Sequence, residues 1–256
     1  MQDLKIAGIQ HDIVWKDKEA NFDALSKILK GLDVDLVVLP EMFQTGFCFE
    51  KEELAEHMSD SKTLKWLEAM ASELQAVVTG SFIAVEDGQF YNRLAWMRPD
   101  GTYETYDKRH LFSMSDEPNH FTAGATKLIV DVNGWKVCPM ICYDLRFPVW
   151  VRNSEYYDAL IFVANWPQRR SMHWEKLLQA RAIENQCYAI GVNRCGYDGN
   201  NIYHDGKSAI ITPMGEVAQH IENEAWVLLQ TIEASEIKKT RRYMPFLRDA
   251  DAFELS

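Results

Sequence analysis

Residues 36–41 read LVVLPE: four apolar residues in a row, a proline that ends the run, and a carboxylate directly after it. A short continuous apolar run predicts a β-strand that is buried on both faces, as in sheets that helices cover on both sides. The same pattern returns at residues 159–164, which read ALIFVA. These two runs favour an α/β fold.

Amphipathic helical patterns separate the strand-like segments. Asp17 can cap a first helix, a second helix is expected from about Ser61, and a third near Trp174, because apolar residues recur there at the spacing of a helix face. The three faces are Phe22, Leu25, Leu29 and Leu32; Leu64, Leu67, Ala71 and Leu74; and Trp174, Leu177, Leu178 and Ala182. Further strands are expected at residues 6–10, 76–85, 188–193, 207–212 and 226–232, and a short helix near residues 234–241. Such alternation of strands and helices is typical of α/β domains.

Turn signals divide the middle of the chain. Asp87-Gly88, Pro99-Asp100-Gly101 and Asn133-Gly134 are typical of β-hairpins. The β-rich segments around these turns are residues 90–98, 102–106, 128–132 and 135–141. Hairpins and crossover helices in one chain predict a mixed sheet or two sheets. No linker, repeat or low-complexity segment interrupts the chain, so we expect one domain over residues 1–256.

The composition excludes several function classes. The 256 residues carry a net charge of −11, which argues against nucleic-acid binding because phosphate contacts need clustered Lys and Arg. The longest apolar run, residues 159–164, is far shorter than the about 20 residues that span a bilayer. The first residues lack the apolar core of a signal peptide. We therefore expect a cytoplasmic protein that has neither a membrane nor a nucleic acid as partner.

The cysteines and histidines indicate neither disulfides nor a metal site. Five cysteines, an odd number without a C-x-x-C pair, stand at positions 48, 138, 142, 187 and 195. The seven histidines lack metal-ligand spacing. No dinucleotide-binding, Walker or G-x-S-x-G motif supports a nucleotide-binding protein or a serine hydrolase. We expect no metal and no cofactor.

Cys142 directly follows the strand-like residues 135–141. At a sharp turn after a strand its side chain would project at the sheet edge, where the N–H groups of a following helix favour a thiolate nucleophile. The alternative is a structural cysteine that packs as a small hydrophobe, and position alone favours this alternative. A tyrosine-phosphatase site is excluded because Pro148, not an arginine, stands six positions after Cys142.

Two other charged residues suit acyl chemistry. Glu41 stands at the carboxyl end of a predicted strand, where ligands of α/β folds gather, and a carboxylate there can act as a general base. Its alternative is an exposed loop carboxylate. Lys108 lies in the charged segment 106–112, which reads YDKRHLF, and its alternative is a solvated charge cluster.

With their flanks, these three residues resemble the signatures of the nitrilase, or carbon–nitrogen hydrolase, superfamily. The segments that carry the resemblance are LPEMF at 39–43, YDKRHLF at 106–112 and ICYDLRFP at 141–148. The similarity extends over nearly the whole chain, from IAGIQ at 6–10 to PMG at 213–215. It implies a four-layer α-β-β-α sandwich that forms a homodimer or larger homo-oligomer.

The resemblance also implies a catalytic triad. Cys142 would attack the carbon of a small amide while Glu41 takes the thiol proton, and Lys108 with the backbone N–H of Tyr143 would hold the oxyanion. The product of this step would be a thioester, which water then hydrolyses. Many members carry a second carboxylate after the lysine, and Glu117 is the best match, although the adjacent Asp116 leaves the register open by one. Glu117 would orient substrate or water.

Within the superfamily, the amidase branch is most similar. The segments NWP at 165–167, ARAIENQ at 180–186 and GYDGN at 196–200 resemble omega-amidases. Such enzymes remove the terminal amide of 2-oxoglutaramate or 2-oxosuccinamate and release ammonia and a 2-oxo dicarboxylate.

A substrate carboxylate calls for a fixed cation, ideally an arginine that can bind both oxygens. Arg170 is the preferred candidate and Arg169 is adjacent to it, whereas Arg146, next to Asp144, is expected to brace the cysteine turn. The aromatic residues Phe43, Tyr143 and Trp166 are expected to wall a small pocket, with plain core packing as the alternative for each.

Two other functions stay open at this point. One is a different activity in the same superfamily: a nitrilase, an N-carbamoyl amino acid hydrolase or an acyl transferase, since these enzymes share a fold and sequence indicates substrate poorly. The other is a non-catalytic scaffold with a vestigial triad. The intact set of Glu41, Lys108 and Cys142 argues against the scaffold.

Overall fold

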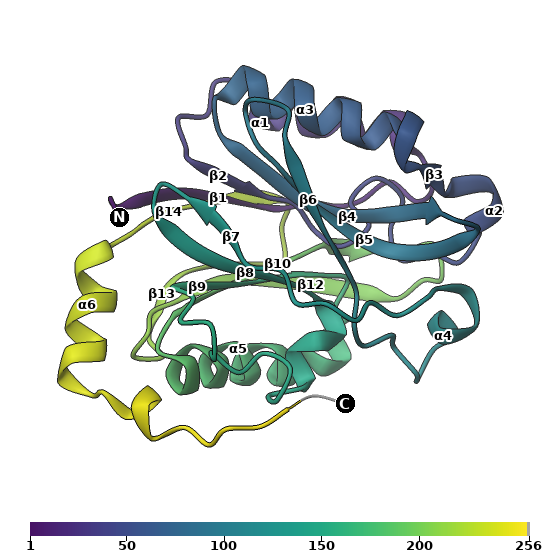
Figure 1. Ribbon diagram of the computed structural model, residues 1–256. Helices are drawn as coiled ribbons and strands as arrows, with labels where there is room; N and C mark the ends of the chain where they lie inside the picture. The colour runs from purple at the N-terminus through teal and green to yellow at the C-terminus, as the bar shows by residue number, and fades with distance from the viewer. Residues whose placement is uncertain (255–256) are drawn as a thin grey trace.

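Two β-sheets lie face to face, and helices cover the outer face of each (Figure 1). This arrangement comes from a computed structural model that describes residues 1–254. Helices α1 (Lys18–Leu29) and α3 (Lys62–Leu74) lie over one sheet, and α5 (Ser171–Asn185) lies over the other. The expected four-layer α-β-β-α sandwich is confirmed.

The first sheet has seven strands and mixed pairing. Its path is β14 (Trp226–Ile232), β1 (Leu4–Gln10), β2 (Leu36–Val38), β4 (Val77–Glu86), β5 (Gln89–Met97) and β6 (Tyr103–Asp107), with β3 (Glu56–His57) beside β4. The strands β1, β2 and β4 are parallel, whereas β5 and β6 continue as antiparallel hairpins.

The second sheet also has seven strands. Its path is β11 (Cys195–Tyr197), β12 (Tyr203–Ile211), β10 (Tyr188–Asn193), β9 (Ala159–Ala164), β8 (Trp135–Ile141) and β7 (Val130–Val132), with β13 (Val217–Glu222) beside β12. The central strands β8, β9 and β10 are parallel. The remaining helices are α2 (Lys51–Leu54), α4 (Glu117–His120) and α6 (Ala234–Tyr243).

Strand β2 shows why the run LVVLPE determines the architecture. Leu36 and Val38 point into the core between the two sheets, whereas Val37 and Leu39 point into the core beneath α1 and α3. All four side chains are fully buried. A strand with an apolar residue at every position therefore needs a covering layer on each side. For β2, the helices α1 and α3 cover one side and the second sheet covers the other.

Local signals in the sequence set the ends of the elements. Asp17 caps α1 by accepting a hydrogen bond from the N–H of Ala20 at 3.0 Å. The hairpin between β4 and β5 turns at Asp87 and Gly88, whose φ angles of 49° and 75° match the left-handed backbone that Asp-Gly favours. The predicted helices and long strands are thus confirmed, with end shifts of a few residues.

The predictions missed several short elements. These are α2, α4, β3, β11 and β13. Strand β13 is largely exposed, so it lacks the apolar alternation that marks a half-buried strand. Strand β12 also begins at Tyr203, four residues before the predicted start at Lys207.

The start of α3 offers a test of stability. Ser61 Oγ accepts from the N–H of Leu64 at 3.0 Å and donates to Glu56 Oε2 at 2.6 Å. Replacing Ser61 by Ala removes both bonds, and we expect the free energy of unfolding in urea to fall by about 1–2 kcal/mol. Ser72→Ala, at an exposed position of the same helix, is the control and should change it by less than about 0.5 kcal/mol. Equal effects of the two substitutions would refute the capping role.

Candidate active site

The polar residues of the site follow the carboxyl ends of strands in both sheets. Glu41 comes three residues after β2, Lys108 directly after β6, Cys142 directly after β8 and Asn165 directly after β9. Because the two sheets are stacked, the ends of these strands meet at one edge of the sandwich. Ligands of α/β folds gather at such an edge.

Glu41 and Lys108 form a buried ion pair. Lys108 Nζ lies 2.8 Å from Glu41 Oε1, and the two side chains are 1% and 0% exposed. The other carboxylate oxygen, Glu41 Oε2, accepts from the N–H of Asn165 at 2.9 Å. The alternatives of an exposed loop carboxylate and a solvated lysine are therefore wrong.

Glu117 completes this cluster. Its two carboxylate oxygens each lie 3.0 Å from Lys108 Nζ, and the side chain is fully buried. Asp116 is exposed and bonds to Asn119 and His120 instead, so the open register is decided in favour of Glu117. Glu117 contacts Lys108 and is not among the residues that line the cavity described below.

Cys142 occupies a tight turn. Its φ of +43° is in the left-handed region that non-glycine residues rarely adopt. Cys142 is also the first residue of the 3₁₀ turn Cys142–Arg146. Asp144 fixes this turn, because its buried carboxylate accepts from the N–H of Ile141 at 3.1 Å and from Tyr106 Oη at 2.8 Å. It also accepts from the N–H of His110 at 3.0 Å.

The expectation that Arg146 braces the cysteine turn is wrong. Arg181 does so from α5, donating to the carbonyl oxygen of Leu145 through Nε at 3.0 Å and Nη2 at 2.7 Å. Arg146 instead lies 4.6 Å from the centre of the Trp166 ring and lines the cavity. The reason is its place at the end of the turn, where the side chain points outward.

The electrostatics of the site differ from the expectation of a thiolate. Burial, then the negative charge of Glu41 and a hydrogen bond with its carboxylate, raise the pKa of Cys142 well above its usual value. Burial lowers the pKa of Lys108, but Glu117 and Glu41 outweigh this effect and raise it. Burial also raises the pKa of Glu117. At neutral pH, Cys142 is therefore a thiol and not a thiolate.

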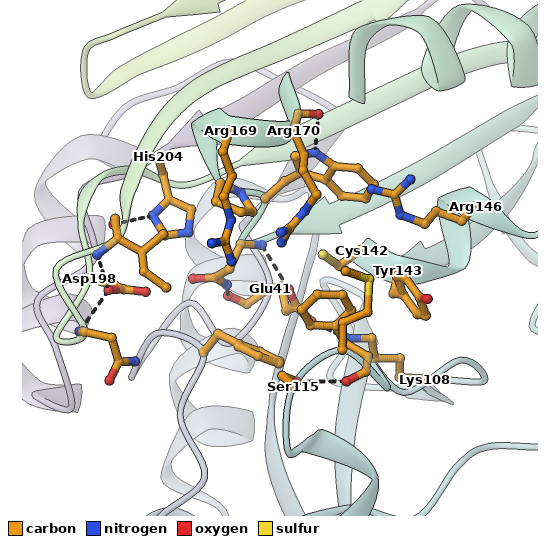
Figure 2. A pocket seen from close by; sticks show the side chains of 18 of the residues that line it. Glu41, Lys108, Ser115, Cys142, Tyr143, Arg146, Arg169, Arg170, Asp198 and His204 are labelled. Carbon is orange, nitrogen blue, oxygen red and sulfur yellow. Dashed lines mark hydrogen bonds and ion pairs between the residues drawn. The ribbon is translucent and has the colours of Figure 1, made fainter. Parts of the chain in front are cut away.

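A cavity of about 180 Å³ opens above these groups (Figure 2). Its lining residues come from both sheets and their loops: Glu41, Phe47, Phe49, Lys108, Phe112, Met114, Ser115, Cys142, Tyr143, Arg146, Asn165, Trp166, Pro167, Arg169, Arg170, Asp198, Asn200, Ile202 and His204. Pockets that bind drug-sized ligands have volumes of about 300–1,000 Å³, so this smaller cavity suits a smaller molecule.

Three arginines give the outer part of the cavity a positive charge. Arg169 and Arg170 extend toward Glu41 and Cys142 in Figure 2, and Arg146 lies to one side of them. Within residues 1–254, none of the three forms an ion pair with a carboxylate. Burial and the neighbouring charges of Arg169 and Arg146 lower the pKa of Arg170. An anion bound here would therefore meet guanidinium groups that no carboxylate of the described residues neutralises.

The predicted aromatic walls are only partly present. Trp166 and Tyr143 line the cavity. Phe43 does not: it is fully buried beneath the helices, with its ring 6.3 Å from that of Phe22 and 5.6 Å from that of Trp66. The core alternative therefore holds for Phe43. It follows Glu41 in sequence but turns to the other face of the sheet.

Several lining residues were not predicted. Phe47 and Phe112 supply the aromatic surface that was assigned to Phe43, and His204 lies at the end opposite Arg146 (Figure 2). Burial, together with the charge of Arg194, lowers the pKa of His204 to about 4, so its imidazole is neutral at pH 7. Asn165 could have been found from its place directly after the apolar run ALIFVA, the same signal that indicated Glu41.

Comparison with known proteins decides the family. The model of the carbon–nitrogen hydrolase family matches residues 5–242. The chain belongs to the carbon–nitrogen hydrolase family. It is 41% identical to omega-amidase YafV of Escherichia coli K12 over the full length of both chains, and 33% identical to 2-oxoglutaramate amidase of Bacillus subtilis over 95% of this chain and 96% of that one.

A solved structure agrees with this assignment. A carbon–nitrogen hydrolase superfamily protein of Xanthomonas campestris, with an arsenic adduct in its active site, is 40% identical and superposes with a TM-score of 0.98 over all of both chains. The nitrilase resemblance is thus confirmed. This chain is an enzyme, a hydrolase that acts on carbon–nitrogen bonds other than peptide bonds.

The described residues of this carbon–nitrogen hydrolase contain neither a side-chain cluster typical of a metal site nor a helix typical of a membrane span. Among the residues that the structure describes, no three His, Cys, Asp or Glu side chains are grouped so that they could hold a metal ion. Every helix in residues 1–254 is too short or too polar to cross a bilayer.

Alkylation of Cys142 tests the electrostatics of the site. The carboxylate of Glu41 raises the pKa of this thiol, so Glu41→Gln should lower the apparent pKa for its reaction with iodoacetamide by roughly one to three pH units. The rate is followed against pH, with the modified cysteine identified by mass spectrometry. Glu52→Gln, an exposed position on α2, should leave the apparent pKa unchanged. An unchanged or higher value in Glu41→Gln would contradict the coupling.

Proposed function

We propose that the enzyme hydrolyses the terminal amide of a small 2-oxo acid amide, such as 2-oxoglutaramate or 2-oxosuccinamate. The products are the 2-oxo dicarboxylate and ammonia, and the intermediate is a thioester on Cys142. One observation carries the proposal: Glu41, Lys108 and Cys142 meet at one end of a small cavity whose outer part holds three arginines without acidic partners.

In the first half of the reaction, Cys142 Sγ bonds to the amide carbon while its proton moves to Glu41. The electrons of the carbonyl double bond move to oxygen and form a tetrahedral oxyanion. Glu41 then gives the proton to the amide nitrogen, the carbon–nitrogen bond breaks, and ammonia leaves. A thiol that stays neutral until attack matches the raised pKa of Cys142.

In the second half, water attacks the thioester carbon and gives a proton to Glu41. Collapse of the new tetrahedral oxyanion breaks the carbon–sulfur bond, and the proton on Glu41 returns to the departing sulfur. The product leaves as a carboxylic acid, which loses its remaining proton to solvent, and the thiol is restored. One carboxylate thus moves the proton in both halves, which suits the position of Glu41 at the cavity floor.

Lys108 and the backbone N–H of Tyr143 are proposed to hold the oxyanion. The ammonium of Lys108 lines the cavity, and two carboxylates keep it charged. Tyr143 is the second residue of a helical turn, where backbone N–H groups lack helical acceptors. Losing one oxyanion donor costs about 2.7–4 kcal/mol of activation free energy in acyl-transfer enzymes.

Arg170 is proposed to bind the carboxylate at the other end of the substrate. Its guanidinium stacks 5.2 Å from the ring of Phe112, which limits its rotation, and its backbone carbonyl accepts from Trp166 Nε1 at 2.8 Å. A carboxylate bound by a preorganised guanidinium gains two parallel hydrogen bonds. The distance between arginines and thiol would then select short ω-amides.

The relatives support both the substrate and the nucleophile. Two of them are named for omega-amidase and 2-oxoglutaramate amidase activity. The Xanthomonas campestris protein carries arsenic in its active site, and arsenic compounds bind thiols. On the family resemblance we also propose that the enzyme is a homodimer or larger homo-oligomer.

An ammonia-release assay tests this function. We expect 2-oxoglutaramate to be hydrolysed at least 100-fold more efficiently, in kcat/KM, than glutamine, asparagine, an N-carbamoyl amino acid or a simple nitrile, because charge and length both match the cavity. Cys142→Ala should abolish turnover while circular dichroism stays unchanged. Activity in Cys142→Ala would refute the role of Cys142 as nucleophile. Preference for the nitrile or the carbamoyl compound would refute the proposed substrate class. Acyl transfer to an added amine in preference to water would indicate a transferase.

Replacing Arg170 tests carboxylate recognition. Losing a charged hydrogen-bond partner should raise the KM for 2-oxoglutaramate by at least about 10-fold, since such bonds contribute about 1.5–3 kcal/mol. The KM of Arg170→Ala for a neutral amide of similar length should change less than about 3-fold by the same reasoning. Arg248→Ala, an exposed arginine outside the cavity, controls for net charge. Equal losses for the charged and neutral amides would exclude this role.

A further inference from the structure

Asn92 has no place in the mechanism above, although it contacts Glu41, Lys108 and Glu117. It lies on β5, is fully buried, and does not line the cavity. Its side-chain Nδ2 donates to Glu41 Oε1 at 2.8 Å and to Glu117 Oε1 at 3.3 Å. Its backbone carbonyl accepts from the N–H of Lys108 at 3.0 Å. One residue therefore holds both carboxylates and the main chain of the lysine.

The contacts form a closed ring. Glu41 Oε1 and Glu117 Oε1 each face the same two donors, Lys108 Nζ and Asn92 Nδ2. Two carboxylates that approach one ammonium repel each other, and a second donor between them offsets this repulsion. A carboxamide does so without adding charge, since its N–H groups do not titrate.

The ring determines which oxygen of Glu41 reacts. Oε1 accepts from both Lys108 and Asn92, so its two lone pairs are taken. Oε2 accepts from the N–H of Asn165, and no second N–H or O–H donor contacts it among the described residues, which leaves one lone pair for the proton of Cys142. Without Asn92, one lone pair of Oε1 would be free, and the carboxylate could rotate or accept its proton there instead of on Oε2.

The need to fill space in the core does not by itself explain why position 92 carries a side-chain amide. Asn92 Oδ1 is buried and has no hydrogen-bond partner within residues 1–254. A buried unpaired oxygen destabilises a fold, so the residue is unfavourable except for what its NH₂ group does. The opposite orientation of the amide would place Oδ1 against two carboxylate oxygens, which repel it.

We propose that Asn92 is a positioning residue that directs Glu41 Oε2 toward Cys142 and keeps the carboxylate pair ionised. The proposal rests on the proposed role of Glu41 as base. Asn92 acts through Glu41 and Glu117 and does not touch substrate.

Two substitutions separate this role from packing. Asn92→Ala removes the donor, and Asn92→Asp keeps the shape but replaces the donor by a third carboxylate oxygen. We expect kcat for 2-oxoglutaramate to fall at least about 10-fold in both, with KM changed less than about 3-fold, because hydrogen bonds to charged groups are strong. Asn92→Asp should be the slower variant. A packing role predicts the reverse order, since Asp fills the space that Ala leaves empty.

The pH profile gives a second readout. Donors stabilise ionised carboxylates, so a pair without Asn92 takes up a proton at higher pH. The acidic limb of kcat/KM should therefore move up by about one pH unit in Asn92→Ala. Asn153→Asp is the matched control, because Asn153 is also a buried amide, whose Nδ2 donates to two backbone carbonyls outside the cavity. It should lower the melting temperature without moving the limb.

The possible outcomes either support or overturn the proposal. A 10-fold loss of kcat with a shifted limb supports it. Loss of kcat with an unshifted limb, or Asn92→Asp as active as Asn92→Ala, overturns it. If Asn92→Asp does not fold, the position of the acidic limb of the kcat/KM profile of Asn92→Ala decides whether the proposal holds. If wild-type enzyme hydrolyses no amide, the proposed function fails separately, and iodoacetamide alkylation of Cys142 against pH, with and without Asn92→Ala, decides the positioning role without substrate.

Discussion

The ammonium of Lys108, buried between the carboxylates of Glu41 and Glu117, is the interaction on which the rest of the site depends. Removing such charges from water costs several kcal/mol for each ion, and only contacts at 2.8–3.0 Å on all sides compensate for it. Burial, and after it the nearby charge of Glu41, raises the pKa of Cys142, whereas the ammonium of Lys108 lowers it. The net effect raises the pKa of this thiol well above its usual value, so the sulfur stays protonated at neutral pH.

The sandwich supplies what this cluster needs. Strands end where their hydrogen bonding stops, so residues just beyond β2, β6, β8 and β9 are free to turn their side chains inward while their backbones remain fixed. Stacking the two sheets brings ends from both into one place and covers them from water. Each of these elements is held by core packing that extends through the molecule, which fixes the geometry of the charges.

The cavity is electrically divided. Its floor holds Glu41, Lys108 and Cys142, whereas its outer part holds Arg146, Arg169 and Arg170. A ligand with an anionic end and a neutral amide end fits this division in only one orientation, with the amide next to Cys142. Orientation of this kind lowers the entropic barrier to reaction, because the reacting atoms are already close when the ligand is bound.

The sequence by itself determined the long strands, the cap of α1 and the hairpin turns, because burial patterns and turn residues are local signals. It indicated Glu41, Lys108 and Cys142 only through the resemblance of their flanking segments to one family, since the position of each residue alone left a structural alternative open. Only the tertiary structure decided that Asn92 joins Glu41, 51 positions away, and that Asn165 reaches it across 124 positions. It also placed Phe43 in the core and Arg146 at the cavity. Such choices depend on which strand ends meet and which face a side chain takes, and on the charges that then surround the thiol, so no local pattern contains them.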